Sequence, residues 1–187
     1  MPLTYTPAPQ FGAKPPDFKL KGVDGKTYAL NDVTGENGLL VMFICNHCPY
    51  VKAIAARLAD DAKTLQAKGI GVVAIMSNDT TTHPADSFEN MQIFASANGF
   101  TFPYVIDETQ TVAKAYGAVC TPDFFGYNKN SELQFRGRLD EVSPSKPATS
   151  VTKKELLEAM TLIAATGKGP ENQTASMGCN IKWKPAA

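Results

Sequence analysis

The fold of this chain is decided by residues 38–49, which read GLLVMFICNHCP. Residues 38–44 are a continuous apolar run, which is typical of a central strand buried on both faces. Proline is favoured at the first position of a helix, so Pro49 predicts that a helix follows this strand directly, with Cys48 as its N-cap. Apolar residues continue at helical spacing, and Gly69 is expected to end the helix.

Strand and helix patterns alternate along the rest of the chain. Asp86, with Glu89 three residues later, predicts a capping box at the start of one helix. The alternation predicts a parallel core to which a late hairpin adds antiparallel strands, so the expected fold class is α/β with one mixed sheet covered by helices. The other predicted elements are a hairpin within 17–30, strands at 72–76 and 104–106, a short helix ending at Gly117, a hairpin of 124–127 with 133–135, and a helix opened by Thr152 and Glu155.

Residues 17–166 are expected to form one domain, because no internal repeat and no long linker divides the chain. Residues 1–16 are rich in proline and predict an irregular arm on the surface. Residues 167–187 form a tail without clear periodicity, in which Ile181 and Trp183 are expected to dock on the domain.

The composition is that of an ordinary globular protein, with 43% hydrophobic and 19% charged residues. Eighteen basic residues balance eighteen acidic ones, which gives no electrostatic case for a nucleic acid or an anionic membrane as partner. The longest apolar stretch is too short to span a bilayer. The N-terminus has no basic region followed by an apolar one, so a cytoplasmic location is expected. Four cysteines in 187 residues are too few for a disulfide scaffold.

The Cys45-x-x-Cys48 pair lies where the buried strand turns into the helix. Unpaired N–H groups and the positive end of the helix dipole stabilise a thiolate there, and they can lower a cysteine pKa to roughly 3.5–7.5. As the expected N-cap, Cys48 is the better candidate for the nucleophile, and Cys45 can then resolve a mixed disulfide. The alternative is that both cysteines are small buried hydrophobic residues.

The segment Phe43–Pro49 resembles the active-site segment of the thioredoxin superfamily, and Gly117–Phe125, with Thr121-Pro122, resembles that superfamily's Thr-Pro segment. The resemblance covers residues 15–165 and is closest to the redoxin, or peroxiredoxin-like, branch related to alkyl hydroperoxide reductase and thiol-specific antioxidant (AhpC/TSA) proteins. It implies a thioredoxin-like fold, with a central mixed sheet flanked by helices and an N-terminal β-hairpin extension. It also implies a cis-proline at Pro122 that faces the cysteines.

The resemblance also has informative departures. Aligned on Phe43, the first cysteine of thioredoxins and the peroxide-attacking cysteine of peroxiredoxins both fall on Cys48. Val41 stands where peroxiredoxins have a proline, and their active-site arginine has no counterpart near Pro122. Two groups that bind and polarise a peroxide are therefore missing, so disulfide exchange is favoured over peroxidase chemistry.

Several other side chains are candidates for the site or its surroundings. A protonated His47 is expected to stabilise a thiolate, although it could equally be a solvated turn residue. Cys120 and Cys179 are candidates for additional redox cysteines, the alternative for each being simple packing. Tyr50 is expected either to shield the thiol or to pack on its own helix. His83 is expected to lie in a loop, and Arg136 and Arg138 are expected to be solvated charges on a strand.

Two classes of function follow. The first is an oxidoreductase that acts on a protein or small-molecule disulfide, takes electrons from a dithiol donor and needs no bound organic cofactor; its peroxidase variant passes through a Cys48 sulfenic acid and would act as an antioxidant. The second is a zinc- or copper-binding module with cysteine and histidine ligands. A homodimer is a further expectation if Phe100, Phe102 and Trp183 are exposed rather than part of the core.

Overall fold

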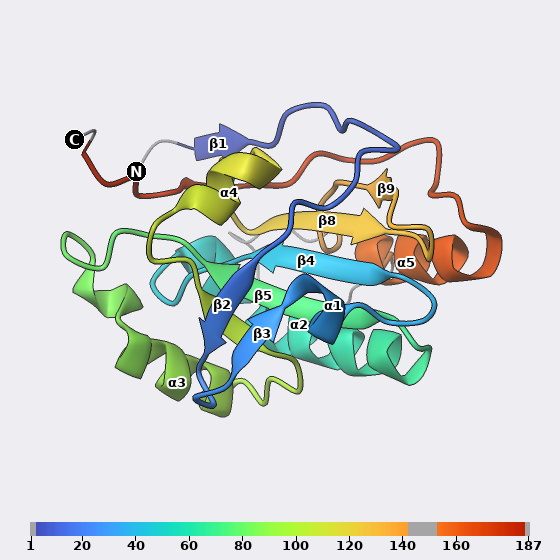
Figure 1. The fold of residues 1–187 in the computed structure, drawn as a ribbon. Helices are drawn as coiled ribbons and strands as arrows, with labels where there is room; N and C mark the ends of the chain where they lie inside the picture. Colours follow the sequence, from blue (N-terminus) through green and yellow to red (C-terminus); the bar gives the residue numbers. More distant parts are fainter. Residues whose placement is uncertain (1–2, 142–152, 186–187) are drawn as a thin grey trace.

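The computed structural model describes residues 3–141 and 153–185 and has an α/β fold with a central mixed sheet (Figure 1). The strand order of this sheet is β3-β2-β6-β5-β4-β8-β9. Its strands are β2 (Lys19–Gly22), β3 (Thr27–Ala29), β4 (Leu39–Phe43), β5 (Gly71–Met76), β6 (Tyr104–Ile106), β8 (Asp123–Tyr127) and β9 (Leu133–Phe135). β4 and β5 are parallel, whereas β4 and β8 are antiparallel, which confirms the predicted mixed sheet.

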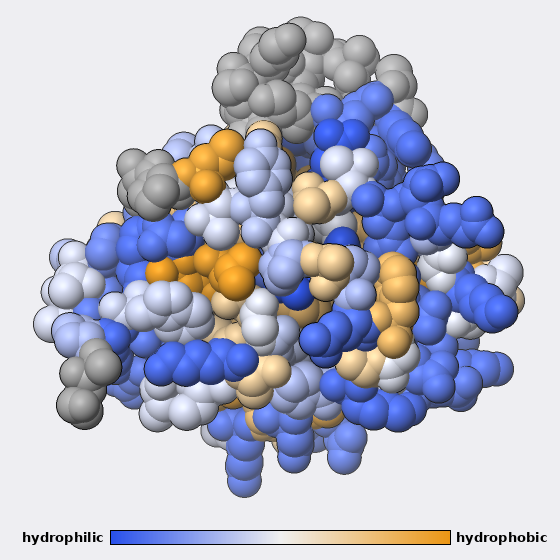
Figure 2. Space-filling view, turned by 90° about the horizontal axis from the view of Figure 1, so that it is seen from above, coloured by the Kyte–Doolittle hydropathy of each residue, from blue (hydrophilic) through white to orange (hydrophobic). Residues whose placement is uncertain are grey.

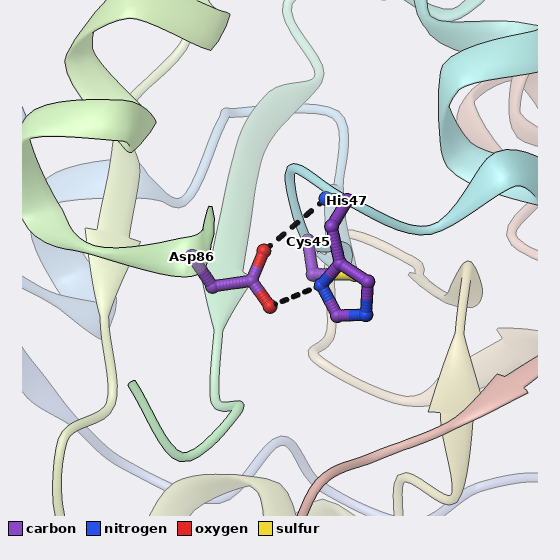
Figure 3. A group of neighbouring side chains, drawn as sticks. All are labelled: Cys45, His47 and Asp86. Carbon is purple, nitrogen blue, oxygen red and sulfur yellow. Dashed lines mark hydrogen bonds and ion pairs between the residues drawn. The ribbon is translucent and has the colours of Figure 1, made fainter. Parts of the chain in front are cut away.

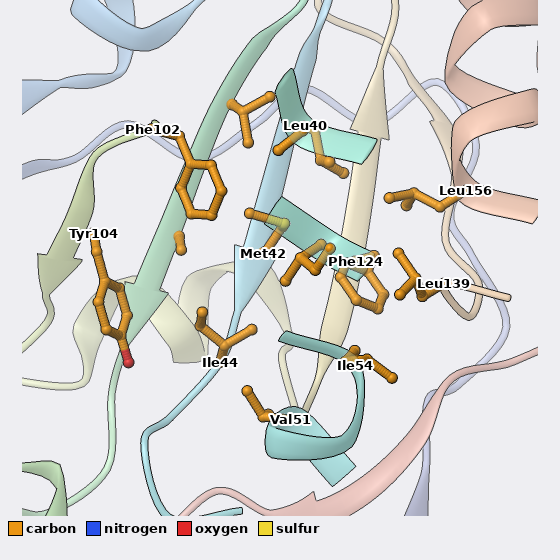
Figure 4. Close-up of a cluster of buried hydrophobic side chains, with 14 of the residues drawn as sticks. Leu40, Met42, Ile44, Val51, Ile54, Phe102, Tyr104, Phe124, Leu139 and Leu156 are labelled. Atoms are coloured by element: carbon orange, nitrogen blue, oxygen red, sulfur yellow. The ribbon is translucent and has the colours of Figure 1, made fainter. Parts of the chain in front are cut away.

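β4 is buried over its whole length, because both of its faces are covered. Its alternate residues Leu40 and Met42 belong to one apolar cluster, and Leu39 and Val41 belong to the other. The first cluster packs against α2 (Pro49–Ala67), α3 (Phe88–Ala97) and α5 (Glu155–Thr166), and part of it is drawn in Figure 4. The second packs against α1 (Leu30–Val33) and α4 (Thr111–Tyr116).

Helix α2 begins as the sequence predicts. Pro49 is its first residue, and Cys48 is the N-cap with extended backbone angles. The junction between β4 and α2 is thereby held on both sides, since β4 lies in the middle of the sheet and α2 packs on that sheet through Val51, Ile54 and Leu58. The Cys-x-x-Cys segment is a short, rigidly supported turn.

A second sheet lies beside the first and joins the two ends of the chain. It has the order β1-β10-β7 and consists of β1 (Leu3–Tyr5), β10 (Met177–Asn180) and β7 (Cys120–Thr121). Residues 1–16 were expected to be wholly irregular, but they contribute β1, which pairs antiparallel with β10 (Figure 1). Figure 2 looks onto the side where β1 and the tail lie, and it shows hydrophobic residues gathered near the middle of this face among hydrophilic ones.

The capping box predicted for Asp86 and Glu89 is wrong. Asp86 ends a short 3₁₀ helix, η1 (Pro84–Asp86), and Ser87 is the N-cap of α3, where its hydroxyl accepts the N–H of Asn90. Ser87 caps the helix because a serine directly before the first helical residue can reach the free N–H groups. The carboxylate of Asp86 does not cap α3 and bonds to other groups. Thr152 lies outside the described residues, and the N-cap of α5 is Lys154.

The expectation of a solvated charge is wrong for Arg136, which is buried and forms an ion pair with Asp123 at 2.9 Å. The Arg138 side chain is 36% exposed, and it pairs with Glu155 at 2.6 Å. Phe102 is buried in the core, and its ring stacks on that of Phe100, which is half-buried and packs against the core. In the tail, Ile181 is buried, while 40% of Trp183 is exposed. None of the helices within residues 3–141 and 153–185 has the length and apolar character needed to cross a membrane.

Candidate active site

The two cysteines of the motif face the loop that contains the cis peptide bond between Thr121 and Pro122. Cys45 Sγ lies 3.3 Å from the hydroxyl oxygen of Thr121, and Cys48 Sγ lies 3.2 Å from the Thr121 carbonyl oxygen. All four cysteines of the chain are buried free thiols. The cis-proline loop that the resemblance implied is therefore present beside the motif, and Thr121 contacts both sulfur atoms.

The environment of the motif makes its two thiols unequal. The pKa of Cys48 is lowered to about 5, above all by a hydrogen bond from the Cys45 thiol. The backbone N–H groups of Cys179 and Val51 lower it further, and burial opposes them. The pKa of Cys45 is raised well above its usual value by its bond to Cys48, by burial and by the charge of Asp86. These shifts favour the ionisation of Cys48 over that of Cys45.

Both protonation states of Cys48 have a neighbour that suits them. A Cys48 thiol donates to the Thr121 carbonyl oxygen at 3.2 Å. The backbone N–H groups of Cys179 and Val51 favour the thiolate electrostatically, although the Cys48 side chain makes no capping hydrogen bond to the first turn of α2. The N–H of Val51 belongs to the first turn of α2, where such groups have no partner within the helix. Cys48 is thus the N-cap, as the sequence predicts, whereas its role as nucleophile stays a prediction.

The turn between the cysteines is anchored by the buried carboxylate of Asp86 (Figure 3). The backbone N–H groups of Asn46 and His47 donate to one oxygen, at 2.8 and 3.2 Å. The other oxygen lies 2.6 Å from His47 Nδ1 and accepts the Asn78 side-chain amide at 2.8 Å. Each carboxylate oxygen thus has two polar neighbours, and together they fix the turn and the orientation of the imidazole ring.

A second group of contacts holds the other side of the turn. The buried Tyr104 hydroxyl donates to the side-chain oxygen of Asn46 at 2.9 Å. The ring of His83 stacks on that of His47 with 5.3 Å between centroids. The sequence predicts no role in the site for Asp86, Asn78 or Tyr104, and it predicts an ordinary loop position for His83. Asp86 has no local signal for its position beside the cysteines, because its spacing to Glu89 indicates a helix cap instead.

The two remaining cysteines lie on neighbouring strands near the motif. Cys179 on β10 pairs with Thr121, and its thiol and backbone N–H both interact with Cys48. Cys120 pairs with Asn180, and its thiol lies 3.7 Å from the Pro122 carbonyl oxygen. Burial is the main cause that raises the pKa of both, to about 11 for Cys179. The structure therefore places Cys179, but not Cys120, in one buried cluster with Cys48.

One group of three potential metal ligands occurs among residues 3–141 and 153–185. Cys45 Sγ, a ring nitrogen of His47 and a carboxylate oxygen of Asp86 lie within 4.8 Å of one another. Both oxygens of Asp86 already accept hydrogen bonds from the turn and from Asn78, so a metal would have to replace contacts that hold the motif in place. The group fits a structural anchor better than a tetrahedral metal site.

A groove runs past the cis-proline loop. Its volume is about 290 Å³, and Tyr5, Tyr50, Ile54, Pro122 and Met177 are among the residues that line it. Tyr50 therefore faces a cavity next to the site rather than packing only within its own helix. The groove reaches Pro122 beside the motif, whereas Cys45 and Cys48 are themselves fully buried.

A thioredoxin-like fold with a Cys-x-x-Cys turn facing a cis-proline defines a protein of the redoxin class. The chain belongs to the AhpC/TSA family, whose sequence profile matches residues 11–139. It is 27% identical over 132 residues to the thiol-disulfide oxidoreductase ResA of Geobacillus thermodenitrificans, which is 71% of each chain. It is 29% identical over 115 residues to the chloroplastic peroxiredoxin Q of Triticum aestivum, which is 62% of this chain and 48% of that one.

Two solved structures match along the whole chain. A conserved protein of Geobacillus kaustophilus has a TM-score of 0.94 and 42% identity, over 100% of this chain and 99% of that one. A hypothetical protein of Sinorhizobium meliloti 1021 has a TM-score of 0.92 and 37% identity, over 98% and 100%. The matches with both structures extend over β1 and the tail that carries β10, so these additions belong to a shared architecture.

Proposed function

We propose that this protein is a thiol–disulfide oxidoreductase in which Cys48 is the nucleophile and Cys45 the resolving cysteine. The observation that carries the proposal is the inequality of the two thiols. The Cys48 pKa is lowered to about 5 at the N-terminus of α2, while that of Cys45 is raised. At neutral pH Cys48 is then a thiolate that can attack a disulfide, and Cys45 is a thiol that keeps its proton until the second step.

The reaction follows from this arrangement. The Cys48 thiolate attacks one sulfur of a disulfide, which forms a mixed disulfide and releases the other sulfur as a thiolate. Cys48 no longer carries a charge at that point, so the hydrogen bond that raised the Cys45 pKa is lost. Cys45 gives its proton to the departing thiolate and attacks Cys48 Sγ, which releases the second sulfur as a thiolate and leaves a Cys45–Cys48 disulfide. A dithiol donor then restores the reduced pair.

The relatives support this class of chemistry, since one of them is named a thiol-disulfide oxidoreductase. The test is the release of thiol when the reduced protein meets a chromogenic aromatic disulfide under anaerobic conditions. Cys48→Ser is expected to abolish the rapid phase, and Cys120→Ser, the matched control, to retain it. A rapid phase of unchanged amplitude in Cys48→Ser would contradict the proposal.

Peroxide reduction is a second candidate, favoured by the relative named peroxiredoxin Q and by the position of Cys48 directly before Pro49. A Cys48 sulfenic acid would condense with Cys45 and release water. Against high efficiency, Val41 replaces a proline, and the guanidinium of Arg136 is committed to Asp123 and to the Gly117 carbonyl. Hydrogen peroxide consumption by the same variants, compared with their disulfide reduction, ranks the two activities.

A further inference from the structure

Strand β10 covers the reactive pair. Cys45 and Cys48 are both fully buried, and Cys179 is 4% exposed. The three cysteines belong to one cluster of buried residues. A substrate disulfide therefore cannot reach Cys48 while β10 stays in place, and the sulfur that is already beside Cys48 belongs to the chain itself.

The register of the small sheet puts Cys179 in this position. Cys179 pairs with Thr121, whose carbonyl oxygen is 3.2 Å from Cys48 Sγ. Gly178 is what allows so close an approach, because a Cβ at this position would collide with the carbonyl oxygen of Thr121 and lie 3.1 Å from the ring of Pro122. The strand is thus fitted against the cis-proline loop, and its cysteine lies on the side of the nucleophile.

Cys179 lies in the same buried cluster as Cys48, and its backbone N–H and its thiol both favour the Cys48 thiolate electrostatically. Burial, and then the interaction with Cys48, raise the pKa of Cys179, which therefore keeps its proton while Cys48 is ionised. Cys120 differs although it is also buried. It pairs with Asn180, and neighbouring residues of a strand point to opposite faces, so its side chain lies on the other face from that of Thr121.

We propose that Cys179 is a second resolving cysteine, carried on β10, and that the oxidised protein includes a Cys48–Cys179 disulfide. The proposal rests on the proposed function, since it needs Cys48 as the nucleophile. β10 is an extended segment that pairs with β7 and carries Cys179 next to Cys48, which is where a bound substrate peptide would present its disulfide. The same strand thus covers the site and supplies a thiol that can react with Cys48.

The chemistry balances without a further reagent. The Cys48 thiolate attacks a small disulfide RSSR, forms Cys48–S–S–R and releases RS⁻. Cys179 gives its proton to this thiolate and attacks Cys48 Sγ, which forms the Cys48–Cys179 bond and releases the second RS⁻. Two protein thiols are oxidised and one disulfide is reduced to two thiols, the same balance as for Cys45. Cys45 can then attack Cys179–Cys48 in turn and return Cys179 to the thiol form.

The experiment removes Cys45 and follows the fate of the mixed disulfide. Reduced Cys45→Ser protein is exposed anaerobically to cystamine, the excess reagent is removed, and intact mass is followed with time. The adduct on Cys48 is expected to decay at least about tenfold faster than in Cys45→Ser/Cys179→Ser, because an intramolecular thiol has a high effective concentration. Peptide mapping should then show a Cys48–Cys179 disulfide. Cys45→Ser/Cys120→Ser is the matched control and should behave like Cys45→Ser.

The outcomes separate the two proposals. An adduct that persists equally in Cys45→Ser and in Cys45→Ser/Cys179→Ser overturns the role of Cys179 but leaves Cys48 as the nucleophile. The absence of any adduct on Cys48 in all three variants overturns the proposed function and this inference with it. If serine at the buried position 45 lowers the melting temperature, Cys45→Ala serves in its place, since alanine brings no hydroxyl into the core.

Discussion

His47 and Asp86 are joined twice, once through the backbone and once through the side chain. The His47 N–H donates to one carboxylate oxygen at 3.2 Å, and His47 Nδ1 lies 2.6 Å from the other. Asp86→Ala would leave these groups and the Asn46 N–H without an acceptor in a buried site. The free energy of unfolding of the reduced protein is expected to fall by about 2–4 kcal/mol.

Chemical denaturation of reduced Asp86→Ala measures this effect. Asp60→Ala is the matched control, because Asp60 is exposed on α2, and its cost should stay within about 0.5 kcal/mol. A loss for Asp86→Ala as small as that for Asp60→Ala would show that the turn between the cysteines does not depend on the carboxylate.

Gly178→Ala tests the close approach of β10 to the cis-proline loop. The added methyl group would meet the Thr121 carbonyl oxygen, so β10 must move away from β7. The overpacking is expected to cost about 1–3 kcal/mol. Alkylation of Cys48 by iodoacetamide should also become faster, because β10 covers this sulfur. Ala175→Val, at an exposed position of the same tail, should change neither the stability nor the alkylation rate. Equal alkylation rates in the two variants would argue that β10 does not control the access of reagents to Cys48.

The thiolate of Cys48 is expected to persist well below neutral pH. Because its pKa is lowered to about 5, the thiolate absorbance of the reduced protein in the ultraviolet should be present at pH 7 and disappear as the pH falls through about 5. Cys48→Ser should remove this transition and leave only thiols that ionise above neutral pH, since the pKa values of Cys45, Cys120 and Cys179 are all raised. A transition near pH 5 that survives in Cys48→Ser would assign the thiolate to another residue.

The two arginines after β9 should differ strongly in their contribution to stability. Arg136→Gln leaves the fully buried Asp123 without its ion pair, and breaking a buried pair costs about 3–5 kcal/mol. Arg138→Gln removes a pair whose arginine side chain is 36% exposed, so water compensates and the cost is about 0–1 kcal/mol. Thermal or denaturant unfolding of the two variants compares them directly, and equal losses would contradict the distinction.

The central strand and the start of α2 could be predicted from the sequence because their signals are local. An apolar run specifies a strand buried on both faces, and a proline specifies the first turn of a helix. The Cys45–Cys48 pair was a candidate for the same reason, since both residues lie at that junction. The prediction that Cys48 rather than Cys45 is the nucleophile came from the expected N-cap position of Cys48. The structure shows this N-cap position.

The surroundings of the pair could not be predicted, because they are contacts between distant segments. Asp86 reaches the turn across 40 residues, and its local spacing to Glu89 imitates a helix cap. Arg136 follows a short strand with alternating residues, so nothing in its neighbourhood shows that Asp123 lies beside it. β10 is a strand of four residues with a glycine, which gives too little alternation to distinguish it from an irregular tail.

The order of the chain has a consequence for its synthesis. Residues 177–180, which cover Cys48, follow every strand of the seven-stranded sheet, so a ribosome makes them after the whole sheet. Domains generally fold as units, so the Cys-x-x-Cys turn stays without its cover until β10 has been made and has paired with β7. During synthesis Cys48 therefore passes through an interval in which it is open to any oxidant or unfolded neighbour nearby. The pairing of β10 with β7 closes that interval.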